Sequence, residues 1–430
     1  MKLSRAPRAL RHRDFTLLWS GQTVSVFGDG IFTIALALET LRVSDHASTL
    51  AYVEASRIVP SALLLLFAGA LVDRLPRRLV VLGADLLRGG AVAVLAALTI
   101  LHQLQVADLV LLSVAVGVGD AFFYPAYKAI IPELLPAELL TQGNAFNSAS
   151  TTVGSSLLGP ALGGVIVAIG GTSTAFAIDA GTFLASGCCL LFMSHVPAPV
   201  RSSASMVSDV RQGLRWTMHQ RWLWYGILAA GVLNFAAFSP TSVTIPLIVR
   251  DVLHQGPLAY GVTFAVGGVG GLLSAVLAGR LGSPRRRMSA IWAAWALASL
   301  SLVGVGLAPD VVVVAACTAL TYFGLTYGNL IWGTLMQTVV PAEMLGRASS
   351  VDWLFSICLS PLGIVFAGVL ASSIGVRETV LVGAALSAVS CLVVFAPGVR
   401  DPDRPEYAPA ALPGPGDAAT NGELREDPRR

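Results

Sequence analysis

Long apolar segments, separated by short polar or Pro/Gly-rich breaks, restrict the fold of this chain more than any other feature of its sequence. A helix needs about 20 mostly apolar residues to cross a bilayer. Twelve segments have about this length: 15–40, 49–72, 79–101, 107–128, 141–169, 174–195, 222–249, 258–281, 288–308, 311–339, 348–374 and 379–397. Only 12% of the residues are charged, compared with about 25% in soluble domains. The pattern predicts an all-α membrane protein with twelve transmembrane helices.

A long polar connection between the sixth and seventh segments divides the chain into two halves with weak internal symmetry, as in transporters built from repeats. The predicted parts are an N-terminal tail (1–14), an N-terminal six-helix bundle (15–195), a central loop (196–221), a C-terminal six-helix bundle (222–397) and a C-terminal tail (398–430). Pro, Gly and charged residues are frequent in the C-terminal tail, which we therefore expect to be disordered. The central stretch "SDVRQGLRWTMHQRWLW" is either a helix on the inner leaflet or a solvated linker.

The positions of the basic residues predict the orientation of the chain, because short cytoplasmic loops carry an excess of Lys and Arg. One side of the predicted membrane holds 23 of them, and the other holds only Arg42, Arg250 and Arg377. Both termini are therefore expected on the cytoplasmic side of a bacterial-type plasma membrane. The net charge of +3 is too small and too scattered to indicate nucleic-acid binding.

Two related loops occur at equivalent places in the halves, "GALVDRLPRRLVVLG" after the second segment and "GRLGSPRRRMSAIW" after the eighth. The first resembles the signature loop of the major facilitator superfamily, with matching residues Gly69, Asp73, Arg74, Arg77 and Arg78. The resemblance covers about residues 10–397, and it implies two six-helix bundles that work by alternating access. It also implies that this loop is a conformational latch facing residues 347–352. The second loop has no acidic residue.

The stretch "GSSLLGPALGG" resembles the helix-5 motif of the antiporter branches, through Gly154, Gly159, Pro160, Gly163 and Gly164. Glycines let helices approach closely, and proline bends a helix. With "FTLLWSGQTVSVFGDGIFTIAL", the stretch is similar to drug and siderophore exporters that include macrolide-efflux and enterobactin-export proteins. This implies antiport-driven export of hydrophobic or amphipathic drugs or natural products. The alternatives are a siderophore or lipid exporter, an importer of the same fold and, more remotely, a membrane scaffold or sensor.

Charged residues inside the predicted spans are the candidates for ion coupling, because a charge at the bilayer centre costs about 2.5–3.5 kcal/mol on insertion scales. The candidates are Asp29, Glu54, Arg57, Asp85, Arg88 and Asp120. At about 1.5 Å per residue, Asp29 is level with Arg57, and Arg88 is level with Asp120. We therefore expect one cluster of Asp29, Arg57 and Glu54, and another of Arg88, Asp85 and Asp120. Each cluster either serves coupling or is a structural ion pair.

Asp29, between Gly28 and Gly30, is the first candidate for proton coupling or for recognition of a cationic cargo. Proton antiport needs a carboxyl whose pKa can cross neutral pH, and in general burial raises that pKa while a nearby arginine lowers it. Arg57 and Glu54 are the expected tuning partners. Asp179 and Asp352 lie close to the ends of their segments, and we expect structural roles for them.

The C-terminal half has few charges in its spans but contains aromatic and amide side chains: Asn234, Tyr322, Tyr327, Asn329 and Trp332. Such groups suit a large amphipathic cargo. For the tryptophans, helix packing is an equal alternative. No catalytic triad, nucleotide-binding loop or metal-ligand spacing appears, so we expect no enzyme activity, cofactor or metal. The expected partners are a small hydrophobic substrate, protons and membrane lipid, and the chain is expected to act as a monomer.

Overall fold

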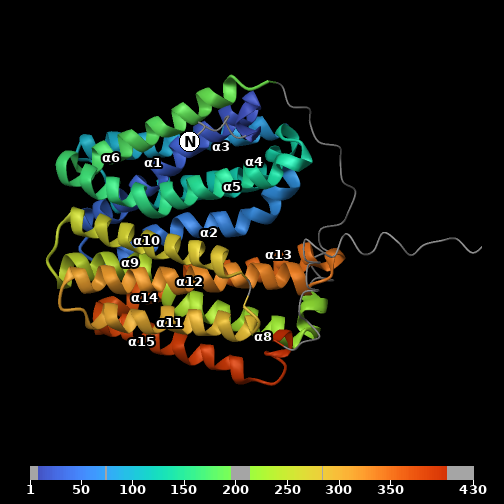
Figure 1. The fold of residues 1–430 in the computed structure, drawn as a ribbon. Helices are drawn as coiled ribbons and strands as arrows, with labels where there is room; N and C mark the ends of the chain where they lie inside the picture. The colour runs from blue at the N-terminus through green and yellow to red at the C-terminus, as the bar shows by residue number, and fades with distance from the viewer. Residues whose placement is uncertain (1–7, 73–74, 195–213, 283, 404–430) are drawn as a thin grey trace, which may run out of the picture.

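The computed structural model describes residues 8–72, 75–194, 214–282 and 284–403, and every regular element in these ranges is helical. The helices of the N-terminal half are η1 (Arg8–Arg11), α1 (Arg13–Val43), α2 (Ala47–Val72), α3 (Arg77–Ile100), α4 (Val106–Leu134), η2 (Ala137–Leu139), α5 (Leu140–Thr151), η3 (Thr152–Leu158) and α6 (Gly159–Leu191). The bar in Figure 1 colours this half blue to green, and its helices lie side by side.

The C-terminal half, yellow to red in Figure 1, forms a second bundle next to the first. Its helices are α8 (Arg221–Leu233), η4 (Asn234–Phe238), α9 (Thr241–Leu247), η5 (Ile248–Val252), α10 (Pro257–Leu281), α11 (Arg287–Leu307), α12 (Val311–Val339), α13 (Ala342–Cys358), α14 (Ser360–Ile374), α15 (Val376–Ser390), η6 (Cys391–Phe395) and η7 (Asp401–Asp403). The expected span 222–249 is not one regular helix, because π-helical turns η4 and η5 interrupt it and Pro246 lies within α9.

Ten stretches of the described residues are long and apolar enough to cross a membrane. One of them, 142–191, has 50 residues and would be about 75 Å long if straight, whereas the hydrocarbon core is about 30 Å thick. The break lies at Gly171, whose φ of 78° favours glycine. This position falls between the expected spans 141–169 and 174–195. The count of twelve spans stays a prediction. Beside the ten stretches, α2, with 26 residues, is a further candidate for a span.

Large apolar side chains are exposed along many of these helices, among them Ile169 at 86% and Phe395 at 70% of their surface. A soluble protein rarely exposes apolar surface on this scale, whereas lipid is the natural neighbour of such side chains. The chain is thus an all-α, multi-pass membrane protein.

The two halves meet closely where α6 and η3 pack on α10 and where α14 packs on α2. A Cβ atom at Gly261 of α10 would lie 2.7 Å from the carbonyl oxygen of Pro160 and 2.8 Å from Cα of Gly164. Nearby, Arg250 donates hydrogen bonds to the carbonyl oxygen of Leu41 (2.6 Å) and to Asp45 (2.8 Å). We call this end, which holds residues 41–47 and 250–257, the predicted outer end. At the opposite end, Nζ of Lys128 lies 5.7 Å from the ring centroid of Trp353 in the other half.

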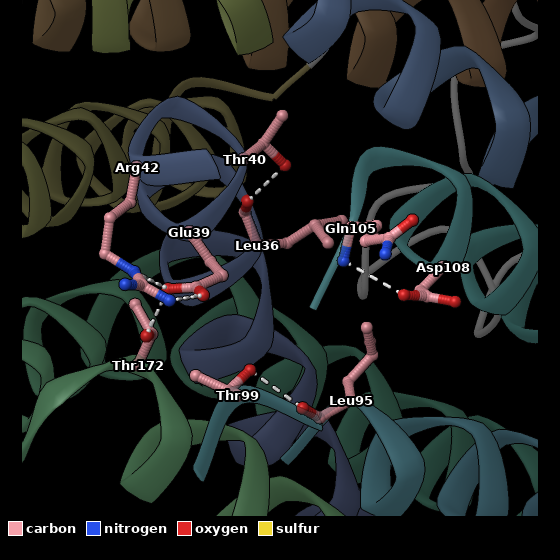
Figure 2. Close-up of polar contacts among 9 residues, drawn as sticks. All are labelled: Leu36, Glu39, Thr40, Arg42, Leu95, Thr99, Gln105, Asp108 and Thr172. Carbon is pink, nitrogen blue, oxygen red and sulfur yellow. Dashed lines mark hydrogen bonds and ion pairs between the residues drawn. The ribbon is translucent and has the colours of Figure 1, made fainter. Parts of the chain in front are cut away.

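The buried carboxylate of Glu39 binds the residue that follows the turn at Gly171. Figure 2 shows its contacts with Arg42 and Thr172. Glu39 near the end of α1 is fully buried, and it accepts hydrogen bonds from Nε of Arg42 (2.9 Å) and from the hydroxyl of Thr172. Because Thr172 follows Gly171 directly, this contact joins α1 to the connection between the two arms of α6. The same figure shows Asp108 capping α4, where it accepts from the backbone N–H of Gln105 (2.9 Å).

The first residues of the predicted C-terminal tail, 398–403, pack against the C-terminal half. Asp403 accepts hydrogen bonds from the backbone N–H groups of Met288 (2.7 Å) and Ser289 (3.1 Å) at the beginning of α11. A carboxylate is stabilised there by the unpaired amides and by the helix dipole. The tail therefore supplies the acid that the loop before α11 lacks. Residues 404–430 and most of the predicted central loop, 195–213, lie outside the described residues.

Candidate functional site

The centre of the N-terminal half contains a buried arginine between two carboxylates. Arg88 of α3 is 1% exposed, and its guanidinium donates to Asp85 on the same helix and to Asp120 of α4 (3.1 Å). Asp85 also accepts from the hydroxyl of Ser186 in α6 (2.8 Å). The ring centroid of Phe123 lies 4.1 Å from the guanidinium carbon of Arg88. The structure thus forms the second cluster that the sequence predicts, and it connects α3, α4 and α6.

Arg57 of α2 joins this cluster instead of pairing with Asp29. Its Nε lies 3.5 Å from the second carboxylate oxygen of Asp120. The cause is a close approach of α2 to α4, because a Cβ atom at Gly117 would overlap the carbonyl oxygen of Arg57. Gly117 and Asp120 share a helix face, so this approach carries Arg57 to Asp120. The expected ion pair between Asp29 and Arg57 is therefore wrong, and the two predicted clusters are one.

Glu54 lies one helical turn from Arg57 and is 7% exposed. No ion pair within 4.0 Å involves Glu54 or Asp29 among the residues that the structure describes. Both carboxyl groups nevertheless interact electrostatically with Arg57. Glu54 and Asp29 therefore lie near Arg57, as predicted, but farther from it than the distance of a salt bridge.

The two glycines that flank Asp29 each make room for a different helix. A Cβ atom at Gly28 would overlap the side-chain oxygens of Asp179 and Thr182 in the second arm of α6. A Cβ atom at Gly30 would lie 2.8 Å from Cα of Gly159 at the beginning of α6. The Gly28–Asp29–Gly30 sequence is therefore explained by close helix packing on both sides of the carboxyl.

Asp179 is the member of this site that the sequence reasoning missed. Its side chain is 1% exposed, and Oδ2 has no hydrogen-bond partner among the described residues. The helical spacing of the residues after it could have indicated its place. One helix face holds Asp179, Thr182, Phe183 and Ser186. That face contacts α1 through Gly28 and α3 through Asp85. Asp179 is therefore packed more deeply between helices than its position near the beginning of the predicted segment indicated.

The helix-5 motif forms contacts in two directions. Gly154 packs on Val26, Gly159 on Gly30 and Gly163 on Ile31, all in α1, while Pro160 and Gly164 contact Gly261 in the other half. The residue types are those that such close approaches require. The motif therefore joins the helix of Asp29 to the boundary between the halves, although its association with transport direction stays a prediction.

The described part of the predicted latch binds within the N-terminal half. Arg77 donates to the carbonyl oxygen of Ala129 (2.8 Å) and pairs with Glu133, and Arg78 donates to the carbonyl oxygen of Leu191 (2.8 Å). These carbonyls are at the carboxyl ends of α4 and α6, where the helix dipole favours a cation. Among the side chains that the structure describes, these two arginines bind α4 and α6, and the expected contact of the latch with residues 347–352 stays a prediction. Gly69 lies within α2, and Asp73 and Arg74 lie outside the described residues.

Trp332 was predicted to line a cargo cavity, but the structure places it in the core of the C-terminal half. It is 6% exposed, and its indole N–H donates to Asp352 (3.0 Å). The rings of Trp222 and Trp295 each lie 6.0 Å from it, and a Cβ atom at Gly226 would clash with it. These contacts favour the alternative, helix packing, and a role for Trp332 in binding cargo stays an untested prediction.

The other cargo candidates lie on η4 and α12. Asn234 donates its side-chain amide to the carbonyl oxygen of Ala230 (3.1 Å), and Tyr322 packs edge-on against Phe264, with the ring centroids 6.4 Å apart. Tyr327 is half-buried and Asn329 is exposed. Their role in binding cargo stays a prediction.

The sequence profile of the transmembrane secretion effector family matches residues 4–420, nearly the whole chain. The chain belongs to this family of major facilitator transporters. Macrolide efflux protein A of Streptococcus pyogenes is 24% identical over 392 residues, which are 90% of this chain and 96% of the relative. The multidrug efflux pump Tap of Mycobacterium tuberculosis (strain CDC 1551 / Oshkosh) is 29% identical over 373 residues, 82% of this chain and 86% of the relative.

Solved structures show the same fold. A bacterial homologue of the lysosomal transporter Spinster, in an inward-facing and unoccupied conformation, aligns with a TM-score of 0.72 and 14% identity, covering 94% of this chain and 100% of the other. A bacterial homologue of the iron transporter ferroportin, in an inward-facing state, aligns with a TM-score of 0.69 and 19% identity, covering 89% and 98%. At these identities the likeness concerns the fold alone.

Proposed function

We propose that this transporter exports hydrophobic or amphipathic drugs or natural products across the bacterial plasma membrane in exchange for protons. The drug class is suggested by the names of the relatives, a macrolide efflux protein and a multidrug efflux pump. We further propose that the chain works as a monomer with both termini in the cytoplasm, and that it has no catalytic activity.

The observation that carries proton coupling is the charge balance in the N-terminal half. Two guanidinium groups, from Arg57 and Arg88, interact there with five carboxyl groups, from Asp29, Glu54, Asp85, Asp120 and Asp179. If all were ionised, three negative charges would be uncompensated inside the bilayer. Because an isolated charge is expensive there, carboxyl groups without a cation bind protons instead. The site therefore holds protons that movement of the helices can release.

Alternating access is supported by the kind of contact at the predicted outer end. There the backbones of α6 and α10 touch through glycines, and Arg250 bonds to the loop after α1. We propose that these contacts close the outer side and separate when cargo leaves. Cargo and protons would both shift the equilibrium between the closed and open arrangements of the two halves.

Drug efflux from a sensitive bacterial host tests the proposal. Cells that express the wild type should accumulate less ethidium and less erythromycin than cells with an empty vector. Dissipating the proton gradient should abolish the difference. Asp29→Asn should lose proton-dependent efflux, because an amide cannot take up a proton at this site. Asp108→Asn, which keeps the cap of α4, is the matched control and should retain efflux.

The results separate the alternatives. Greater accumulation in cells that express the transporter would favour an importer, and efflux of iron chelates without drug efflux would favour a siderophore exporter. If efflux continues unchanged in Asp29→Asn at every external pH, proton coupling through this residue is wrong. A purified, reconstituted protein that moves neither cargo nor protons would favour a scaffold or sensor.

A further inference from the structure

The carboxyl group of Asp179 is sealed in a position where no cation pairs with it. Its side chain is 1% exposed, its Oδ2 has no hydrogen-bond partner among the described residues, and its Oδ1 lies against the backbone of Gly28. The next residue along α1 after Gly28 is Asp29. The contact of α1 with α6 at Gly28 therefore brings two acidic residues into the same region of the packing.

Thr182 supplies the hydrogen bond that the Asp179 side chain accepts. Its hydroxyl donates to the backbone carbonyl oxygen of Asp179 (2.7 Å) and to Oδ1 (3.2 Å). A hydroxyl has one proton, so this donor is divided between two acceptors. Among the described residues, Oδ2 has no donor. Because a buried carboxylate without a cation is costly, we expect this carboxyl to bind a proton.

The cations near this pair are bound elsewhere. Arg88 of α3 donates to Asp85 and Asp120, and Arg57 of α2 pairs with Asp120 of α4. Arg57 and Arg88 act on Asp179 only through longer-range electrostatics, as does Asp29 of α1. A buried carboxyl group that has no cation paired with it and a second acid nearby does not ionise cheaply, and binding a proton is the usual solution.

We propose that Asp29 and Asp179 form a single buried proton-binding site of α1 and α6, which takes up one proton and in which Asp29 follows the glycine that packs against Asp179. Asp29 is half-buried and is the member through which the proton enters and leaves, because Asp179 is sealed. Loading adds one proton to the dicarboxylate, and release returns it without any other change in bonding. The role of this proton in transport rests on the proposed function, but the existence of the site does not.

Infrared difference spectroscopy of the purified protein in lipid tests the site without any substrate. Several buried carboxyl groups can contribute to the carbonyl stretch of protonated acids, so the variants are compared with the wild type. The wild type should show a component from Asp179 that disappears as the pH rises, and Asp179→Asn should lack this component. Asp29→Asn should shift the pH at which it disappears by at least about one pH unit, because strongly interacting groups titrate as a pair. Asp108→Asn, the control, should leave both the band and its pH dependence as in the wild type.

Folding of the variants is checked by thermal unfolding and by size-exclusion elution in detergent. Asp179→Asn should fold, because its amide oxygen can accept from Thr182 as the carboxyl does. The proposal is overturned if the spectrum of Asp179→Asn equals that of the wild type at every pH, or if Asp29→Asn leaves the pH dependence of the Asp179 component unchanged. An absence of the band in the wild type at every pH would also overturn it.

Proton movement in proteoliposomes separates the site from its use. Addition of ethidium to vesicles that contain a pH dye should drive proton flux in the wild type and at least about tenfold less in Asp179→Asn. If the infrared results hold but ethidium drives no proton flux in the wild type, the site exists and the proposed antiport function is wrong. If flux in Asp179→Asn equals that of the wild type, the transported proton does not bind here.

Discussion

Substitution of Gly261 by alanine should disturb the closed contact between the halves at the predicted outer end. The added Cβ atom would lie 2.7 Å from the carbonyl oxygen of Pro160 and 2.8 and 3.0 Å from Cα and N of Gly164. All three atoms belong to backbone, which cannot turn aside as a flexible side chain can. The halves must therefore separate slightly at this point to accept the methyl group.

The size of the effect follows from the cost of overpacking, about 1–3 kcal/mol for an extra methyl or methylene in a tightly packed site. Because the clash is between halves, this cost falls on the closed arrangement and spares the packing within each half. The equilibrium between closed and open outer ends should then shift about 5- to 150-fold towards the open form.

Pulsed electron resonance between spin labels measures this shift. Labels on cysteines introduced at His46 and Gln255, exposed positions in loops of opposite halves, report the separation of the outer ends. The native cysteines are replaced first. The Gly261→Ala variant should gain a population with a longer distance, and its efflux activity should fall.

Gly279→Ala is the matched control, because Gly279 lies in the same helix and a Cβ atom there would have no neighbour within 4 Å. It should leave distances and efflux unchanged. An unaltered distance distribution in Gly261→Ala would refute the inference that the glycine contact holds the outer end closed. The same change in both variants would show that the effect comes from helix propensity and not from the contact.

Three further substitutions test the energetics of other contacts. Arg88→Met should lower stability by about 3–5 kcal/mol, seen as a lower thermal unfolding midpoint in detergent, because it leaves Asp85 buried without its cation. Thr172→Val should cost about 1–3 kcal/mol, because it removes a donor from buried Glu39, and should speed hydrogen exchange around the turn at Gly171. Asp403→Ala should cost about 0.5–2 kcal/mol, and limited proteolysis should cut the C-terminal tail sooner, because α11 loses the acid at its first turn.

The fold was predictable from the sequence because spans depend on composition over about 20 residues, a signal that no single contact can change. The depth of a residue along a helix was predictable in the same way, and it correctly brought Arg88 level with Asp120. The partner of Arg57 was not, because it depends on which helices approach most closely. Gly117 lets α2 approach α4 closely, and this approach pairs Arg57 with Asp120 instead of Asp29. A single sequence does not reveal which helices pack in this way.

The buried positions of Asp179 and Trp332, which the sequence did not indicate, have a common physical origin. Each residue was assigned by its distance from the end of a segment or by its chemical type, and each is buried by small residues on another helix. Gly28 makes room for Asp179, and Gly226 makes room for Trp332. A glycine that faces a polar or aromatic side chain on a neighbouring helix therefore indicates that this side chain is buried. To use this signal one must know which helices are neighbours.

The helix-5 motif connects the proposed proton site to the contact between the halves. Gly159 touches Gly30, next to Asp29, and Gly164 touches Gly261 on the other half. Five residues of helix, about 7.5 Å, separate these two points. If the halves part at Gly261, the beginning of α6 loses its support on that side while keeping its contact with α1. Any resulting movement of α1 against the second arm of α6 acts directly on the pair of Asp29 and Asp179, because Asp179 packs against Gly28, the residue before Asp29. Opening of the outer end and the distance between the two carboxyl groups are therefore coupled through one short stretch of backbone.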